Sequence, residues 1–205
     1  MGEAAVSGWN RMARVLHWGT AFAIAVEAPA GLIMSWTYVA RDPAGKASHL
    51  LSSQVHHTLG LLLLIAVAFR IAWRLTLGHP PLPAHSSRSE VALAACVQGL
   101  LYLLLLALPL SGWAALSSMA AGAGYPAPEL WFFGLNGFGP HGFIPHIVPP
   151  VPWNAPVLLK YRLFAHIHVW CLWLGGALLA LHVAGALKHH LINRNDVLTR
   201  MWKGI

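Results

Sequence analysis

Residues 161–190 constrain this 205-residue chain more than any other segment, because they are mostly apolar and yet include five histidines. Two of these, His168 and His182, are fourteen residues apart. At about 3.6 residues per turn, fourteen residues complete almost four helical turns, so both imidazoles project from nearly the same face. A rise of about 1.5 Å per residue separates them by about 21 Å along the axis. In a hydrocarbon core about 30 Å thick, one imidazole therefore lies near each edge.

The composition indicates a membrane protein. The chain is 57% hydrophobic and 9% charged, whereas a soluble domain has about 25% charged residues. The formal charge of +7 is spread over segment ends rather than gathered on one element, which favours membrane-flanking charges over a nucleic-acid partner. The two cysteines, Cys96 and Cys171, form no CxxC or CxxCH motif, and this excludes covalent c-type haem attachment.

The distribution of apolar residues predicts an all-α membrane protein, a single domain over residues 1–205 with four transmembrane helices. The predicted spans are residues 13–39, 49–77, 91–116 and 163–190. Residues 40–48 are predicted to form a turn, and residues 78–89 a proline-rich linker. Residues 117–160 are expected to form a long outer loop, with a short helix at 128–133. A basic tail follows the last span.

Positive charges predict the orientation of the bundle. One side of the predicted membrane has eight Lys or Arg residues, which are Arg11, Arg14, Arg74, Arg88, Lys188, Arg194, Arg200 and Lys203. The opposite side has four, which are Arg41, Lys46, Lys160 and Arg162. Because cytoplasmic loops carry the excess of Lys and Arg, both termini are predicted to be cytoplasmic.

This topology gives a depth to each histidine within a span. His17 and His182 are predicted on the inner side, and His56 and His168 on the outer side. Two pairs follow, and neutral imidazoles are good ligands of haem iron. Two nitrogens on opposite faces of a porphyrin saturate the iron, which favours electron transfer over oxygen binding. His166 is not selected, because its helical phase points it away from His182.

Two arginines are candidate partners of haem propionates. Arg70 lies fourteen residues after His56, on the same predicted stripe and at the inner depth, and this spacing also favours His56 over the adjacent His57. Arg14 precedes His17 by one turn. Arginine can pair with a carboxylate by two hydrogen bonds, but both cations could instead lie at the membrane boundary.

Glu27 is the only acidic residue inside a predicted span. It could carry protons to a quinone, or it could hydrogen-bond a neighbouring group. Acidic groups within a membrane are functional candidates by default. The second, structural role is the favoured interpretation.

The four spans together resemble the bacterial cytochrome b561 family. The segments that carry the resemblance are RVLHW, QVHHTLGLLLLIAVAFRIAWRL, LLYLLLLALPLSGW and HVWCLWLGGALLALHVAGALKHH. The resemblance implies a four-helix protein of the bacterial inner membrane with two b-type haems between its helices. It assigns the haem ligands to His17, His56, His168 and His182, in agreement with the pairs above.

The resemblance also implies an activity. Within the family, the chain is similar to the superoxide:ubiquinone oxidoreductase type, an oxidoreductase that takes electrons from superoxide outside and reduces ubiquinone. The loop at 117–160 is longer than in that type, so the electron donor is the open question. Lys160 and Arg162 could attract an anion such as superoxide, although ordinary membrane-flanking charge is the favoured role.

Two other functions remain open. The chain could be a cytochrome b subunit that links a partner dehydrogenase or hydrogenase to quinone, in which case a redox protein would dock on it. It could also be a haem-free, histidine-rich membrane protein that transports or handles metal ions. The first alternative predicts co-purification with a soluble redox subunit, and the second predicts a colourless protein.

Overall fold

The fold is a bundle of long helices. The structure is a computed structural model, and it describes residues 8–77, 80, 86–119, 129–130, 135–138, 142–152 and 154–204. Its long helices are α1 (Arg11–Thr37), α2 (Pro43–Leu77), α3 (Arg88–Ser117) and α4 (Tyr161–Leu187). A π-helical turn, η1 (Lys188–Ile192), and a short helix, α5 (Val197–Trp202), follow α4. The four long helices are each long and apolar enough to cross a membrane, as predicted.

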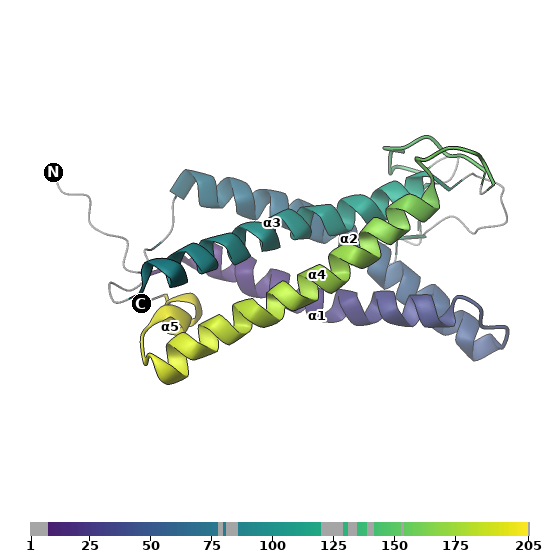
Figure 1. Ribbon diagram of the computed structural model, residues 1–205. Coiled ribbons are helices and arrows are strands. Elements are labelled where there is room, and N and C mark those ends of the chain that lie inside the picture. The colour runs from purple at the N-terminus through teal and green to yellow at the C-terminus, as the bar shows by residue number, and fades with distance from the viewer. Residues whose placement is uncertain are drawn as a thin grey trace.

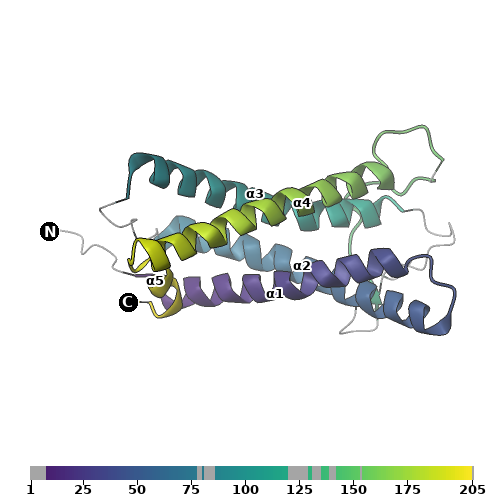
Figure 2. The ribbon, with the colours of Figure 1, turned by 60° about the horizontal axis from the view of Figure 1, so that its bottom comes forward.

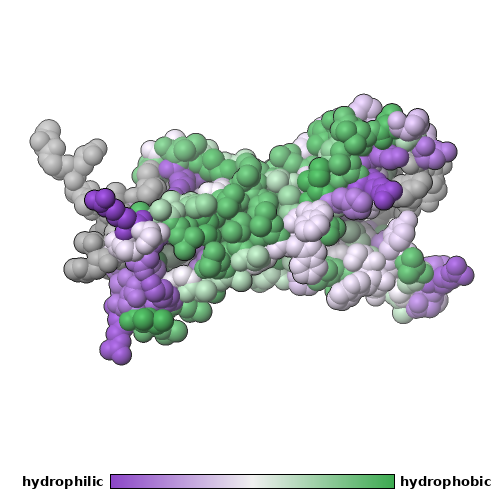
Figure 3. Space-filling model, in the orientation of Figure 1, coloured by the Kyte–Doolittle hydropathy of each residue, from purple (hydrophilic) through white to green (hydrophobic). Residues whose placement is uncertain are grey.

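The helices run alongside one another in two closely packed pairs. α1 packs along α2 and α3 packs along α4, while α2 joins the pairs by contacting α3. Figures 1 and 2 show that α5 lies beside the start of α1, and that the segment between α3 and α4 lies at the opposite end. These are called below the α5 end and the loop end. Figure 3 shows an apolar band between two polar ends, the pattern of a protein that spans a bilayer.

The interior of the bundle is small. Val67 on α2 is fully buried, and Leu63, Val97 and Leu104 are nearly so. No residue of α4 is buried, and large apolar side chains such as Trp170 are exposed on its surface. Apolar side chains on the outside of a membrane helix face lipid, so exposure here does not imply an unfilled interface.

The predicted turn at 40–48 was partly wrong, because α2 begins at Pro43. The carboxylate of Asp42 accepts a hydrogen bond from the N–H of Gly45 at 2.9 Å, and its carbonyl accepts from Lys46 at 3.1 Å. Asp42 therefore caps the helix, and proline is well suited to the first helical position, where its missing N–H is not needed. These local signals extend the helix beyond the apolar segment.

The helix predicted at 128–133 is not found in its two described residues. Glu129–Leu130 (β1) pairs antiparallel with Leu135–Asn136 (β2), and residues 128 and 131–133 lie outside the described part of the chain. Nearby, Trp113 Nε1 donates to the carbonyl of Pro145 at 2.9 Å. His146 Nδ1 lies 2.7 Å from the carbonyl of Ser117. These contacts attach residues 145–146 to the end of α3.

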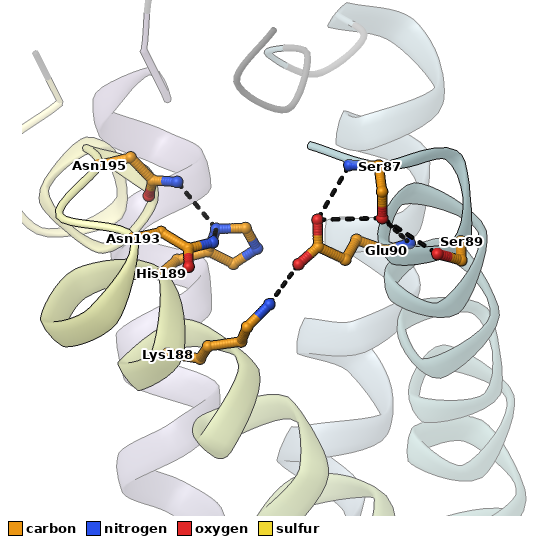
Figure 4. A network of polar contacts seen from close by, with 7 residues as sticks. All are labelled: Ser87, Ser89, Glu90, Lys188, His189, Asn193 and Asn195. Atoms are coloured by element: carbon orange, nitrogen blue, oxygen red, sulfur yellow. Dashed lines mark hydrogen bonds and ion pairs between the residues drawn. The ribbon is translucent and has the colours of Figure 1, made fainter. Parts of the chain in front are cut away.

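Polar contacts connect the helices at the α5 end. Ser87 and Glu90 form a capping box that begins α3, which satisfies backbone N–H groups that the first helical turn leaves unpaired. Glu90 also pairs with Lys188 at the start of η1. Asn195 contacts Nδ1 of His189 at 2.9 Å, and Figure 4 shows these groups together. The predicted basic tail is thus folded against the bundle.

Candidate functional site

The first pair of predicted ligands meets toward the loop end. His56 on α2 and His168 on α4 have ring centroids 5.9 Å apart, with ring planes at 89° to one another. His57 lies next to this pair, and its Nδ1 atom is buried with no hydrogen-bond partner among the described residues. His166 is exposed, on a different face of α4 from His168. The structure therefore brings together the two histidines that the helical phase selects.

The second pair meets toward the α5 end. His17 on α1 and His182 on α4 have ring centroids 6.2 Å apart and planes at 60°. α4 thus provides one imidazole to each pair, and α1 and α2 provide the others. The fourteen-residue spacing along α4 separates the two pairs by about 21 Å.

The distances between the rings fit a metal bound between them. An imidazole nitrogen binds a metal at about 2 Å, so two rings on opposite sides of one ion place their centroids about 6 Å apart. Cα atoms of α4 rarely come within 8 Å of those of α1 or α2. The two imidazole pairs therefore join helices that do not pack closely against one another.

Two glycines leave room for the rings of the loop-end pair. A Cβ atom at Gly31 of α1 would lie 2.8 Å from Cε1 of His56. A Cβ atom at Gly112 of α3 would lie 3.3 Å from Cε1 of His168. Each imidazole is thus set against the backbone of a neighbouring helix, and this limits how far it can turn.

Hydrogen bonds orient the imidazoles of the loop-end pair. His168 Nδ1 donates to the carbonyl of Leu108 at 2.8 Å, with Ser111 Oγ at 3.2 Å. His56 Nδ1 donates to the backbone carbonyl of Glu27 at 3.3 Å. In a neutral imidazole the proton on Nδ1 leaves a lone pair on Nε2. Both rings therefore have the tautomer of a ligand that binds through Nε2, with its other nitrogen held by an acceptor.

The α5-end pair has a cationic partner, Arg70. Arg70 of α2 donates from Nη2 to Nδ1 of His17 at 2.8 Å, and its guanidinium lies 5.2 Å from the ring centroid of Tyr102. Because arginine only donates, His17 Nδ1 is the acceptor here and the ring proton is on Nε2. Binding of iron by Nε2 of His17 would therefore require Arg70 to take another partner.

Comparison with known proteins places these features in a family. A family model for prokaryotic cytochrome b561 matches residues 8–204. The chain belongs to the prokaryotic cytochrome b561 family. Cytochrome b561 homolog 2 of Escherichia coli is 29% identical over 149 residues, which are 72% of this chain and 69% of the relative. Cytochrome b561 homolog 1 of the same organism is 25% identical over 186 residues, 91% of this chain and 92% of the relative.

Membership defines the general role of the chain. It is a multi-pass electron-transfer protein of the bacterial inner membrane, in a family whose members bind haem b. The four imidazoles fit this cofactor, since two of them can bind one iron from opposite faces. Among the described residues, no group of three or more His, Cys, Asp or Glu side chains is placed to hold a metal ion.

Arg14, the second predicted propionate partner in this cytochrome b561, has a different contact here. Its Nη1 donates to the carbonyl of Trp202 in α5 at 3.0 Å. Trp18, beside the ligand candidate His17, donates to the carbonyl of Met201 at 3.1 Å and packs edge-on against the Trp202 ring. The C-terminal helix is therefore attached to the first turns of α1, next to the α5-end pair.

Sequence reasoning missed two groups of contacts in this cytochrome. The side chain of Glu27 lies against His56, with Oε1 3.1 Å from Nδ1, although no spacing within one helix relates them. Gly31 and Gly112 pack against imidazoles of other helices. The signal for Glu27 was its presence as an acidic residue in an apolar span, which indicated a role but could not identify its partner.

Proposed function

We propose that this chain binds two b-type haems and carries electrons across the membrane from a donor at its outer face to ubiquinone. His56 and His168 would hold one haem, and His17 and His182 the other. The observation that carries the proposal is the meeting of imidazoles from different helices, 5.9 Å and 6.2 Å apart by ring centroid, at two depths of one bundle. Each bound haem would supply an iron that is reversibly reduced by one electron.

The chain's own residues bind, orient and shield these cofactors. The carbonyls of Leu108 and Glu27 hold the loop-end imidazoles with Nε2 free to ligate. Arg70 would exchange His17 for a propionate, which can accept two hydrogen bonds from a guanidinium. Arg14 could do the same only by giving up the Trp202 carbonyl, so Arg70 is the better-placed candidate.

The loop end would face the outside, because the positive charges of the sequence favour cytoplasmic termini. Superoxide is the proposed donor. Two superoxide anions would each lose one electron to become oxygen, and ubiquinone would take up two electrons and two protons to become ubiquinol. Arg162 at the start of α4 is exposed, whereas Lys160 donates to the carbonyl of Ala155 at 2.9 Å. Arg162 is therefore the more available cation for attracting an anion.

Haem quantification with an absorption spectrum tests the binding part of the proposal. Purified protein should contain about two b-type haems per chain with a six-coordinate, low-spin spectrum, since each iron would have two imidazole ligands. A colourless protein, or one haem per chain, would contradict it.

Stopped-flow reduction of the haems by superoxide, with and without ubiquinone, tests the donor. Reduction should exceed the uncatalysed reaction and slow as salt is raised, because electrostatic attraction is screened. The variant Arg162→Gln should slow it at low salt, and Arg41→Gln is the control, since Arg41 is an exposed arginine between α1 and α2 at the same end. If superoxide fails while the haems are present, a redox partner protein becomes the expected donor.

A further inference from the structure

Glu27 and His56 form a close contact that the electron-transfer role itself does not require. Glu27 Oε1 lies 3.1 Å from His56 Nδ1, and the Glu27 carbonyl lies 3.3 Å from the same atom. Both side chains are largely shielded, with 14% of Glu27 and 16% of His56 exposed. An acidic side chain inside an apolar span is costly to retain. This one lies against a proposed haem ligand.

The surrounding packing leaves space for the carboxyl group at that position. A Cβ atom at Gly60, one turn after His56 on α2, would lie 3.2 Å from Glu27 Oε1. The second oxygen, Oε2, is buried with no hydrogen-bond partner among the described residues. The Nδ1–H group of His56 is therefore the donor that Glu27 faces.

The two proposed haem sites differ in the charge beside their imidazoles. At the loop end, His56 has the acidic side chain of Glu27, and His168 has the neutral carbonyl of Leu108. At the α5 end, His17 has the guanidinium of Arg70. Hydrogen bonds and charges near an axial ligand are among the means by which a protein sets a haem potential.

Glu27 and Arg70 would shift the reduction potential of a nearby haem in opposite directions. A hydrogen bond from an imidazole to a carboxylate raises the basicity of the ligating nitrogen and stabilises the oxidised iron. A nearby cation stabilises the reduced iron, which has one positive charge fewer. A haem held beside an ionised Glu27 would thus be harder to reduce than a haem held beside Arg70.

We propose that Glu27 is a positioning residue that fixes the tautomer of His56 and lowers the reduction potential of the loop-end haem below that of the α5-end haem. The inference rests on the proposed function. With both haems bound, one electron would then pass downhill from the loop-end haem, which would be oxidised, to the α5-end haem, which would be reduced. No bond forms or breaks in this step, and no proton needs to move.

Potentiometric titration of purified Glu27→Gln tests the proposal, because glutamine keeps the shape and an acceptor oxygen but removes the charge. The reduction potential of one of the two haems should rise by at least about 59 mV, which corresponds to a tenfold change in the equilibrium constant for one-electron reduction. The reduction potential of the other haem should be unchanged. Electron paramagnetic resonance of the oxidised protein should show altered g values for one low-spin haem and unchanged values for the other.

Two control variants separate this effect from general changes. Glu90→Gln removes one carboxylate from the other end of the bundle, where Glu90 pairs with Lys188, and should leave both potentials unchanged. Ser111→Ala removes a neutral group 3.2 Å from His168 Nδ1 and should shift the loop-end potential far less than Glu27→Gln. If Glu27→Gln impairs folding, Gly60→Ala offers a second route, since its Cβ atom would lie 3.2 Å from Oε1 and push the carboxyl group by a few tenths of an ångström, and it should raise the same potential by a smaller amount.

Outcomes for the inference and for the proposed function are distinct. If the unaltered chain lacks two haems, the proposed function fails before any variant is compared. If two haems are present but Glu27→Gln shifts neither potential, or shifts both equally, only the inference is overturned. A lower potential at the affected haem would overturn it as well.

Discussion

Arg70 donates a hydrogen bond to Nδ1 of His17 at 2.8 Å, and this places a cation against one member of the α5-end imidazole pair. The same guanidinium lies over the ring of Tyr102, so α3 helps to hold it even though α3 contains no histidine. A haem bound between His17 and His182 would bring propionates that compete for this cation. Arg70 therefore links the packing of α3 to the chemistry of the pair.

Removal of this cation should lower one haem potential. In Arg70→Gln the positive charge that stabilises reduced iron is lost, so the α5-end haem should become at least several-fold harder to reduce. Arg70→Lys retains the charge but not the fork-shaped donor, and should have the smaller effect. Potentiometric titration of both variants measures the difference. Equal potentials in all three proteins would show that Arg70 does not act on the haem.

Single substitutions of the four histidines should remove haem in a pairwise pattern. His17→Ala and His182→Ala should each lose the same haem, and His56→Ala and His168→Ala the other, so each variant keeps about one haem of two. The double variant of one pair should resemble either single variant, because the two rings would share one iron. Haem quantification and redox titration measure this. His166→Ala is the control, and loss of haem from it would contradict the ligand assignment.

Alanine at Gly31 should disturb the loop-end pair. Its Cβ atom would lie 2.8 Å from Cε1 and 2.9 Å from Nδ1 of His56, so the ring must move or the helices must separate. Overpacking of this kind costs about 1–3 kcal/mol, more than the helix propensity of up to about 1 kcal/mol that alanine adds. The expected result is a lower melting temperature and a weaker loop-end haem signal.

Gly99→Ala is the matched control for that change. Gly99 is also within a long helix, and a Cβ atom there would meet nothing within 4 Å. Its stability should equal or slightly exceed that of the unaltered chain, because alanine adds helix propensity without a clash, and its haem content should be unchanged. If both alanine variants behave alike, the close approach of His56 to the α1 backbone is not a constraint on the site.

The C-terminal helix should detach when its contacts with α1 are weakened. Trp202→Ala removes the edge-on contact with Trp18 at 5.0 Å between ring centroids, and such aromatic pairs contribute about 1 kcal/mol. Residues 197–204 should then be cleaved faster by protease added at the α5 end of the bundle, while the haem content stays near normal. Unchanged cleavage would show that the two backbone acceptors, at Met201 and Trp202, are enough to hold α5.

Local pattern was sufficient to predict most of the fold. Four apolar segments of membrane length predicted four helices, because each must satisfy its backbone hydrogen bonds internally. Their ends were less predictable, since Asp42 and Ser87 extend helices into polar sequence by capping. α5 was missed because it is short and because its hydrogen bonds with Arg14 and Trp18 join distant parts of the sequence.

The sequence by itself determined the four helices, the similar helical phase of His168 and His182, and the expectation of two imidazole pairs, because spacing along one helix is a local property. Only the tertiary structure decided which groups surround each ring. Glu27 meets His56, and Arg70 meets His17, through the packing of α1 against α2. Contacts between helices depend on their relative rotation and depth, which no single segment encodes, and these contacts place an acidic residue beside one site and a basic residue beside the other.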